Sequence, residues 1–239
     1  MRLAMWSGPR NLSTALMRSF GSRSDAVVCD EPLYAHYLHA TGRPHPGAAE
    51  IIADGETDWQ RVADGLTGDI PDGRAVFYQK HMAHHLLDDI GRSWLSKLTH
   101  AFLIRDPFDM LTSLLAVFPD ADLRDTGLPQ QVALFDEACR TGRIPPVIDS
   151  RDLSAHPRAI LTQLCDAVQI PFEPSMLAWD PGPRATDGIW SRHWYGRVED
   201  TTHFVPFRAH DRQLPADKAS VYQACVPLYA HLYAHRLTP

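Results

Sequence analysis

The stretch RLAMWSGPRNLSTALMRSFGSR (residues 2–23) combines a strand, a turn and a helix in direct succession. The apolar run RLAMWS (2–7) predicts a buried strand, and the spacing of the apolar residues over 11–23 predicts a helix with one buried face. Gly8 and Pro9 make a tight turn between the two. A strand followed at once by a helix is the opening unit of an α/β fold.

The turn has the features of an anion-binding loop. Its position places the first backbone N–H groups of the helix around any anion that enters, and Arg10, Ser13 and Thr14 would add donors. It lacks the Gly-Lys pair of the loop G-x-x-x-x-G-K-[ST], which argues against a magnesium–nucleoside triphosphate as ligand. The alternative is an ordinary helix that Asn11 or Ser13 caps.

The rest of the chain continues this alternation of apolar runs and helical stretches. Further strands are predicted at residues 25–30, 74–80, 99–105 and 145–150, and helices after each, including one from the third strand through about residue 96. This pattern predicts an α/β fold with a parallel sheet wrapped on both faces and a ligand site at the carboxyl ends of the strands.

Composition is that of an ordinary globular protein. The 239 residues, 44% of them hydrophobic and 22% charged, suffice for one domain over residues 1–239. A formal net charge of −6 argues against a sequence-independent nucleic-acid binder. We expect a cytoplasmic protein without a membrane-spanning segment, because no apolar run approaches the necessary length.

Two irregular segments interrupt the pattern. Residues 42–73 are polar and turn-rich, and we expect an insertion or lid over the site. Residues 171–215 contain several prolines and the stretch WSRHWYGR, and we expect this segment to cover substrate or cofactor.

A second anion site is indicated by RDPFDMLTS (105–113). Arg105 ends the fourth predicted strand, and Ser113 lies two helical turns later, so both could contact one ligand lying along that helix. The alternative makes Arg105 the partner of Asp106 and Ser113 a residue of the helix face.

Three segments in this order resemble the sulfotransferase superfamily, which uses 3′-phosphoadenosine 5′-phosphosulfate (PAPS). SGPRNLST (7–14) resembles the loop that holds the 5′-phosphosulfate, and RDPFDMLTS the segment whose Arg and Ser hold the 3′-phosphate. IDSRDLSAHPRAILTQLCDAVQIPFEPSML (148–177) resembles the later segment that packs a helix behind the sheet. The resemblance implies a three-layer, P-loop NTPase-like α/β fold with a central, mostly parallel sheet flanked by helices.

The resemblance also implies roles for individual residues. Arg10 corresponds to the basic residue that neutralises the leaving phosphate, and Leu12 stands where the family usually has glycine. WSRHWYGR loosely resembles the segment that closes over the nucleotide, which makes Arg192 and Arg197 candidates. The expected cofactor-binding residues are Ser7, Gly8, Pro9, Arg10, Asn11, Leu12, Ser13, Thr14, Arg105, Ser113, Arg192 and Arg197.

The expected catalytic residues are Arg10, Glu31, Lys80 and His81. Lys80 would stabilise the transferring oxygens, and either Glu31 or His81 would act as the base. Neighbours on a strand point to opposite faces, so Lys80 and His81 enter one cavity only if the strand has already ended. In related enzymes the catalytic glutamate lies three residues later, at a position that is Tyr34 here. Glu31 is equally compatible with a role at the start of a helix.

We expect no metal site, although His81, His84 and His85 would share one face if they were helical. The function that the sequence predicts is transfer of a sulfuryl group from PAPS to a hydroxyl or amine of a small acceptor. The alternatives are a P-loop-type small-molecule kinase and a catalytically silent domain that binds a nucleotide or a partner.

Overall fold

The computed structural model describes residues 1–208 and 211–239. The predicted irregular segment 171–215 therefore includes two residues, 209 and 210, that lie outside the described ones. The strands are β1 (Arg2–Ser7), β2 (Ala26–Asp30), β3 (Val76–Met82), β4 (Thr99–Ile104) and β5 (Val147–Asp149). The helices are α1 (Ser13–Gly21), α2 (Tyr34–Thr41), α3 (Ala48–Asp54), α4 (Trp59–Thr67), α5 (Pro107–Leu115), α6 (Leu128–Cys139), α7 (Ser150–Ala155), α8 (Pro157–Ala167), α9 (Ser191–Trp194), α10 (Gly196–Glu199) and α11 (Ala219–Tyr233).

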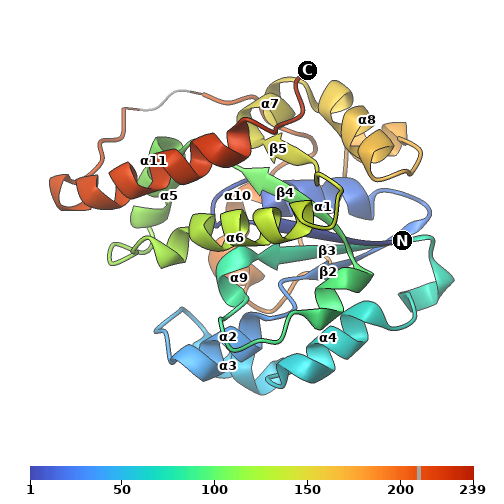
Figure 1. Ribbon diagram of the computed structural model, residues 1–239, viewed down its shortest axis with the longest axis horizontal. Coiled ribbons are helices and arrows are strands. Elements are labelled where there is room, and N and C mark those ends of the chain that lie inside the picture. Colours follow the sequence, from blue (N-terminus) through green and yellow to red (C-terminus); the bar gives the residue numbers. More distant parts are fainter. Residues whose placement is uncertain (209–210) are drawn as a thin grey trace.

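The strands form one sheet in the order β2-β3-β1-β4-β5, and every pairing among the described strands is parallel. Side chains alternate along β1, so Leu3 and Met5 belong to one hydrophobic cluster while Ala4 and Trp6 belong to another. Helices α1 and α8 cover the first face, and α5, α6 and α11 cover the second (Figure 1). This confirms the predicted α/β fold with a parallel sheet between two helical layers.

The prediction of a helix after the third strand is wrong. Strand β3 runs on to Met82, and two short 3₁₀ turns follow it, η2 (Ala83–His85) and η3 (Ser93–Lys97). Gly91 lies between these turns, and a Cβ placed there would come within 3.0 Å of the Trp59 ring. Gly91 thus packs closely against α4, a contact that periodicity alone does not reveal.

The segment 42–73 contains α3 and α4. Helix α3 lies beside α2, where Ile51 is buried with Tyr34 and Tyr37. Helix α4 contributes Val62 and Leu66 to the cluster on the α6 side of the sheet.

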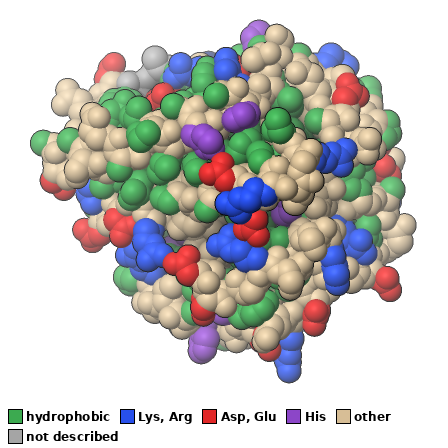
Figure 2. Space-filling model, in the orientation of Figure 1, with side chains coloured by type: hydrophobic (Ala, Val, Ile, Leu, Met, Phe, Trp, Pro, Cys, Tyr) green, Lys and Arg blue, Asp and Glu red, His purple; other side chains and the backbone are tan. Residues whose placement is uncertain are grey.

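Basic and acidic side chains are interspersed on the face shown in Figure 2, in keeping with the formal net charge of −6. Within residues 1–208 and 211–239, no helix combines the length and the apolar character that crossing a membrane requires.

Candidate active site

A cavity of about 560 Å³ lies at the carboxyl ends of the strands. Its wall includes the segments that follow β1, β2, β4 and β5, together with the end of β3. Ligands of open parallel sheets bind at this edge, and the volume lies in the range of small-molecule sites.

The loop between β1 and α1 forms one end of the cavity. Of the residues predicted there, Pro9, Arg10, Asn11, Leu12, Ser13 and Thr14 line it. Ser7 and Gly8 are not part of the wall: the Ser7 hydroxyl donates to the His81 carbonyl at 3.3 Å, and a Cβ on Gly8 would come within 2.2 Å of the Thr126 carbonyl oxygen. The structure therefore places these two residues behind the cavity wall, where their contacts support the loop.

The N-terminus of α1 faces this end of the cavity. No side chain caps it, and Leu12 stands at the N-cap position. Ser13, Thr14 and Ala15 open the helix and line the cavity. The first amides of a helix lack partners within the helix and carry a partial positive charge, so this end offers N–H donors to an anion.

Leu12 adopts a left-handed backbone conformation, with φ 67° and ψ 14°. Arg10 has φ 62°, so the loop contains two residues in a region that favours glycine. The resemblance in sequence placed a family glycine at position 12, and the backbone conformation there explains that glycine. The loop keeps the left-handed conformation despite the leucine.

We expect Leu12→Gly to be more stable than Leu12→Ala by about 1 kcal/mol, because only glycine adopts this conformation without a Cβ penalty. Both variants lose the leucine side chain, so their difference isolates the backbone. Urea unfolding measures it. At an ordinary loop position with negative φ, the alanine variant would be the more stable of the two. If Leu12→Ala is more stable than Leu12→Gly, the left-handed conformation assigned to Leu12 is contradicted.

Several arginines line the cavity, among them Arg10, Arg105 and Arg197. Arg10 Nε donates to Ser113 Oγ at 3.1 Å, and Arg105 Nη1 donates to the Arg10 carbonyl oxygen at 2.7 Å. Burial and the nearby charges of Arg197 and Arg105 lower the pKa of Arg10. Cations held this close repel one another, and a bound anion would relieve that repulsion.

The structure separates the two arginines predicted in the later segment. Arg197 lines the cavity, whereas Arg192 lies outside the wall that the described residues form. The Arg192 guanidinium pairs with Glu50, and its side chain is 54% exposed. The expectation that Arg192 binds cofactor is therefore corrected: its partner lies on α3, at the surface.

Glu31 follows β2 and borders the middle of the cavity. Its φ is 40°, although it precedes Pro32, and residues before proline favour extended backbone. Such strain persists where the surrounding structure fixes it, and it is common at functional sites. Burial raises the pKa of Glu31, Lys80 opposes this shift, and Asp30 adds to it.

The Lys80 ammonium is fully engaged with protein partners. Its Nζ lies 2.8 Å from Asp30 Oδ1 and 2.7 Å from Glu31 Oε1, and it also donates to the Tyr195 hydroxyl. Burial alone would lower the pKa of Lys80, but the two carboxylates raise it. An ammonium has three donors, and these three partners use all of them. The expectation that Lys80 points at the transferring oxygens is corrected, because the structure places it where it holds Glu31.

His81 lies in the core, outside the cavity wall formed by the described residues. Its ring stacks on Trp6 with 4.3 Å between ring centroids, and burial lowers its pKa to about 3. Strand β3 continues to Met82, so Lys80 and His81 point to opposite faces of the sheet. The expectation that His81 could serve as the base is therefore corrected.

Two residues that sequence reasoning did not select contribute to the site. His85 lines the cavity beside Glu31, with 4.0 Å between His85 Nδ1 and Glu31 Oε2, and its ring stacks on Tyr34. Tyr195 also lines the cavity and contacts Glu31 at 3.4 Å. The run HMAHH is a sequence signal for His85, and it is equally compatible with metal binding, packing and contact with substrate. Tyr195 had no local signal beyond its place in WSRHWYGR.

In the part of the chain that the structure describes, no group of three His, Cys, Asp or Glu side chains could hold a metal ion. His84 and His85 both lie in the 3₁₀ turn η2, and the rings of the two residues contact each other. Burial is the main cause that lowers the pKa of His84, to about 3, and that of His85 well below its usual range. Both imidazoles are thus neutral near pH 7, and they line the cavity together with the carboxyl groups of Glu31 and Asp125.

Comparison with known proteins gives matches of two kinds. The sequence model of a family described as sulfotransferase domain matches residues 1–236. The chain is also 36% and 35% identical over 231 residues to branched-chain-amino-acid aminotransferase-like proteins 1 and 2 of Arabidopsis thaliana. Each match covers 96% of this chain and 41% of the relative, so the chain spans about two fifths of the length of these curated relatives.

Two solved structures share the fold. The sulfotransferase domain from the curacin biosynthetic pathway superposes with a TM-score of 0.53 at 15% identity, covering 99% of this chain and 98% of that one. The sulfotransferase domain from the olefin synthase of Synechococcus PCC 7002 gives a TM-score of 0.50 at 15% identity, covering 94% of both chains. At this level of identity the likeness shows the fold, and it confirms the predicted three-layer, P-loop-like arrangement.

Proposed function

The chain belongs to the sulfotransferase domain family, and on that premise we propose that it transfers a sulfuryl group from PAPS to a hydroxyl or amine of a small acceptor. The observation that carries the proposal is the convergence of Arg10, Arg105 and Arg197 on the uncapped N-terminus of α1. When bound, PAPS supplies the activated sulfuryl group and leaves as 3′-phosphoadenosine 5′-phosphate.

The residues at this end of the cavity fit a ligand with two anionic groups. Arg10 and the amides that open α1 would hold the 5′ side, with Ser13 and Thr14 as hydroxyl donors. Arg105 and Ser113 would hold the 3′-phosphate. Arginine suits this task because its planar fork matches the oxygens of phosphate and sulfate.

Glu31 is the base that the geometry favours. Lys80 and Tyr195 occupy its Oε1, which leaves Oε2 on the side of His85 and the cavity. Glu31 would take the proton of the acceptor as the acceptor oxygen or nitrogen bonds to sulfur and the bond from sulfur to the 5′-phosphate oxygen breaks. Arg10 and the loop amides would stabilise the charge that develops on the leaving phosphate.

The acceptor would lie against the wall opposite the loop. That wall is built mainly from rings and neutral imidazoles with the Asp125 carboxyl beside them, which favours a small organic molecule with an apolar face over a polyanion. The residues concerned are Tyr34, His45, His84, His85, Phe118 and Trp194.

The role proposed for Glu31 predicts that His81→Gln keeps its turnover number within about threefold of the parent, because general-base effects of 10²–10⁴ belong to residues that reach the substrate. The variant loses the ring stack on Trp6, so its unfolding midpoint in urea falls. Turnover and unfolding are measured on the same preparation. A hundredfold loss of turnover in a folded His81→Gln variant would show that His81 takes part in the reaction and would contradict this prediction.

The proposal is tested by incubating the protein with PAPS and an acceptor panel: a phenol, an aliphatic alcohol, a disaccharide and a primary amine. Acceptor-dependent release of 3′-phosphoadenosine 5′-phosphate that persists in EDTA is the expected result. Nucleotide turnover that requires magnesium would favour the kinase alternative. Binding of the nucleotide without transfer to any acceptor would favour the silent domain.

A further inference from the structure

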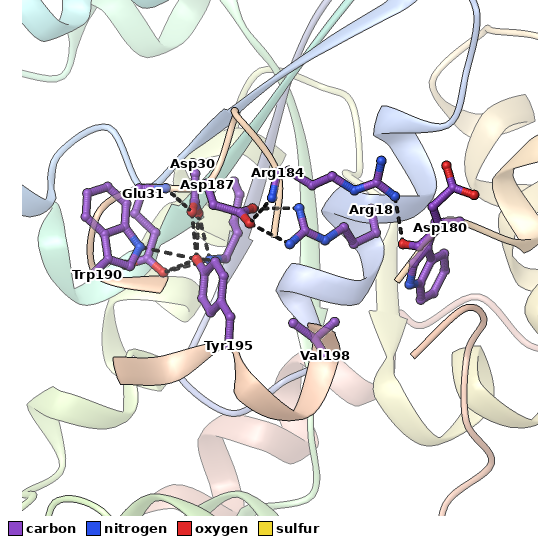
Figure 3. A network of polar contacts seen from close by, with 12 residues as sticks. Arg18, Asp30, Glu31, Asp180, Arg184, Asp187, Trp190, Tyr195 and Val198 are labelled. Carbon is purple, nitrogen blue, oxygen red and sulfur yellow. Dashed lines mark hydrogen bonds and ion pairs between the residues drawn. The ribbon is translucent and has the colours of Figure 1, made fainter. Parts of the chain in front are cut away.

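A buried polar network extends from Glu31 far beyond the cavity (Figure 3). At its other end, Arg18 on α1 forms a bidentate ion pair with Asp187, with 2.6 Å for both contacts. The two side chains are only 3% and 2% exposed. Asp187 also accepts from the Arg184 amide at 2.8 Å, and the Gly188 amide donates to Asp30 at 3.2 Å.

These contacts fix residues 184–198, which we call the covering segment. Arg18 ties the segment to α1, and Asp30 ties it to the end of β2. Removing one partner of a buried ion pair costs about 3–5 kcal/mol, because the other charge is left unpaired. The Arg18–Asp187 pair therefore anchors the segment stably to α1.

Tyr195 is the point at which the covering segment meets the catalytic carboxylate. Its hydroxyl lies 2.9 and 2.7 Å from the two Asp30 oxygens and 3.4 Å from Glu31 Oε1. It also receives hydrogen bonds from Lys80 and, at 3.2 Å, from Trp190 Nε1. Burial and the adjacent carboxylates raise the pKa of Tyr195 well above its usual range, so the phenol keeps its proton and donates it to a carboxylate.

The same residue lies next to the nucleotide end of the cavity. Arg197 follows two positions later in α10, lines the cavity and lies close enough to Arg10 to lower its pKa. One short stretch thus carries both a contact to the base and a cation of the anion site.

We propose that Tyr195 is a positioning residue that couples Arg197 to Glu31. The covering segment then fixes the position of Arg197, the cation at the nucleotide end of the cavity, together with that of Glu31, the proposed base. The proposal rests on the proposed function, because both ends of the coupling are assigned through it. Tyr195 acts through other residues: its hydroxyl orients carboxylates, and its backbone places Arg197.

A double-mutant cycle tests the coupling. The variants are Tyr195→Phe, Arg197→Ala and the double variant, and calorimetry measures their affinity for 3′-phosphoadenosine 5′-phosphate. We expect Tyr195→Phe to weaken binding about three- to tenfold, because its hydroxyl acts on the nucleotide only through Arg197, and to cause no further loss once Arg197 is removed. The matched control is Tyr222→Phe on α11, whose phenol lies outside the cavity wall of the described residues.

Each outcome bears on one proposal. Additive losses, or a Tyr195→Phe affinity equal to that of the parent, overturn the coupling while the proposed function stands. A parent protein that does not bind the nucleotide overturns the proposed function and the coupling with it.

A second readout checks that Tyr195→Phe is folded and altered at the intended place. The chain has three lysines, at 80, 97 and 218, so the ¹³C spectrum of lysine-labelled protein reports each of them. The Lys80 signal should shift in Tyr195→Phe, because its hydrogen-bond partner is lost, while Lys97 and Lys218 stay in place. An unmoved Lys80 signal contradicts the contact on which the proposal depends.

Discussion

Glu31→Gln lowers the turnover number by about 10²–10⁴, the range that a positioned general base contributes, and leaves nucleotide affinity within about threefold. Glutamine has the size of glutamate and keeps an oxygen for Lys80, but it does not take a proton near neutral pH. The loss should therefore fall on turnover and leave binding intact. Steady-state kinetics with PAPS and the best acceptor, beside calorimetry of the nucleotide, separate the two.

The pH dependence of turnover is a second test of Glu31 as the base. Burial raises the pKa of Glu31 above that of an ordinary glutamate, and the base works only when it is ionised. Turnover of the parent should thus fall as the pH drops through this raised pKa, with an acid limb above the usual glutamate range. Glu31→Gln should lose that limb. Glu56→Gln, at a partly exposed carboxylate before α4, is the control and should keep both rate and profile. Parent-like turnover in Glu31→Gln would contradict the assignment of the base.

Arg105→Ala weakens binding of 3′-phosphoadenosine 5′-phosphate by about 10- to 150-fold, because a hydrogen bond to a charged group contributes about 1.5–3 kcal/mol. Arg105 would hold the 3′-phosphate, and it also supports the loop through the Arg10 carbonyl. Adenosine 5′-phosphate lacks the 3′-phosphate, so its affinity should change much less. Calorimetry with both ligands measures the difference.

The control for this experiment is Arg61→Ala, whose side chain is 74% exposed on α4. It should bind both ligands as the parent does. Equal losses for the two ligands in Arg105→Ala would mean that Arg105 only supports the loop, and unchanged affinity would remove it from the site.

Much of the fold followed from local sequence signals. The inner strands β1, β3 and β4 are largely buried on both faces, and all five strands appear in the sequence as short apolar runs. The loop before α1 could be located because Gly8, Pro9 and a helical pattern directly follow a strand, whereas the absence of a side-chain cap became visible only in the structure. The sequence motifs also placed Arg10, Arg105 and Ser113 at one edge of the sheet, and the structure brings these residues together although they lie about a hundred residues apart in the chain.

The errors share a physical cause. His81 and Lys80 are neighbours in sequence, and only the length of β3 decides which of them reaches the cavity. Arg192 and Arg197 lie in one short stretch, and their separation depends on the path of the covering segment. Tyr195 gains its partners Asp30 and Lys80 from strands more than a hundred residues away, so no local pattern could reveal it.

The most direct test of the account is a calorimetric titration of the purified protein with 3′-phosphoadenosine 5′-phosphate without magnesium, with ATP as the comparison. The arginines at the loop, the open N-terminus of α1 and the missing lysine of nucleotide-hydrolysing loops predict tight, metal-independent binding that is selective over ATP. Absence of binding, or binding of ATP alone in the presence of magnesium, would contradict the assignment of this cavity as a PAPS site.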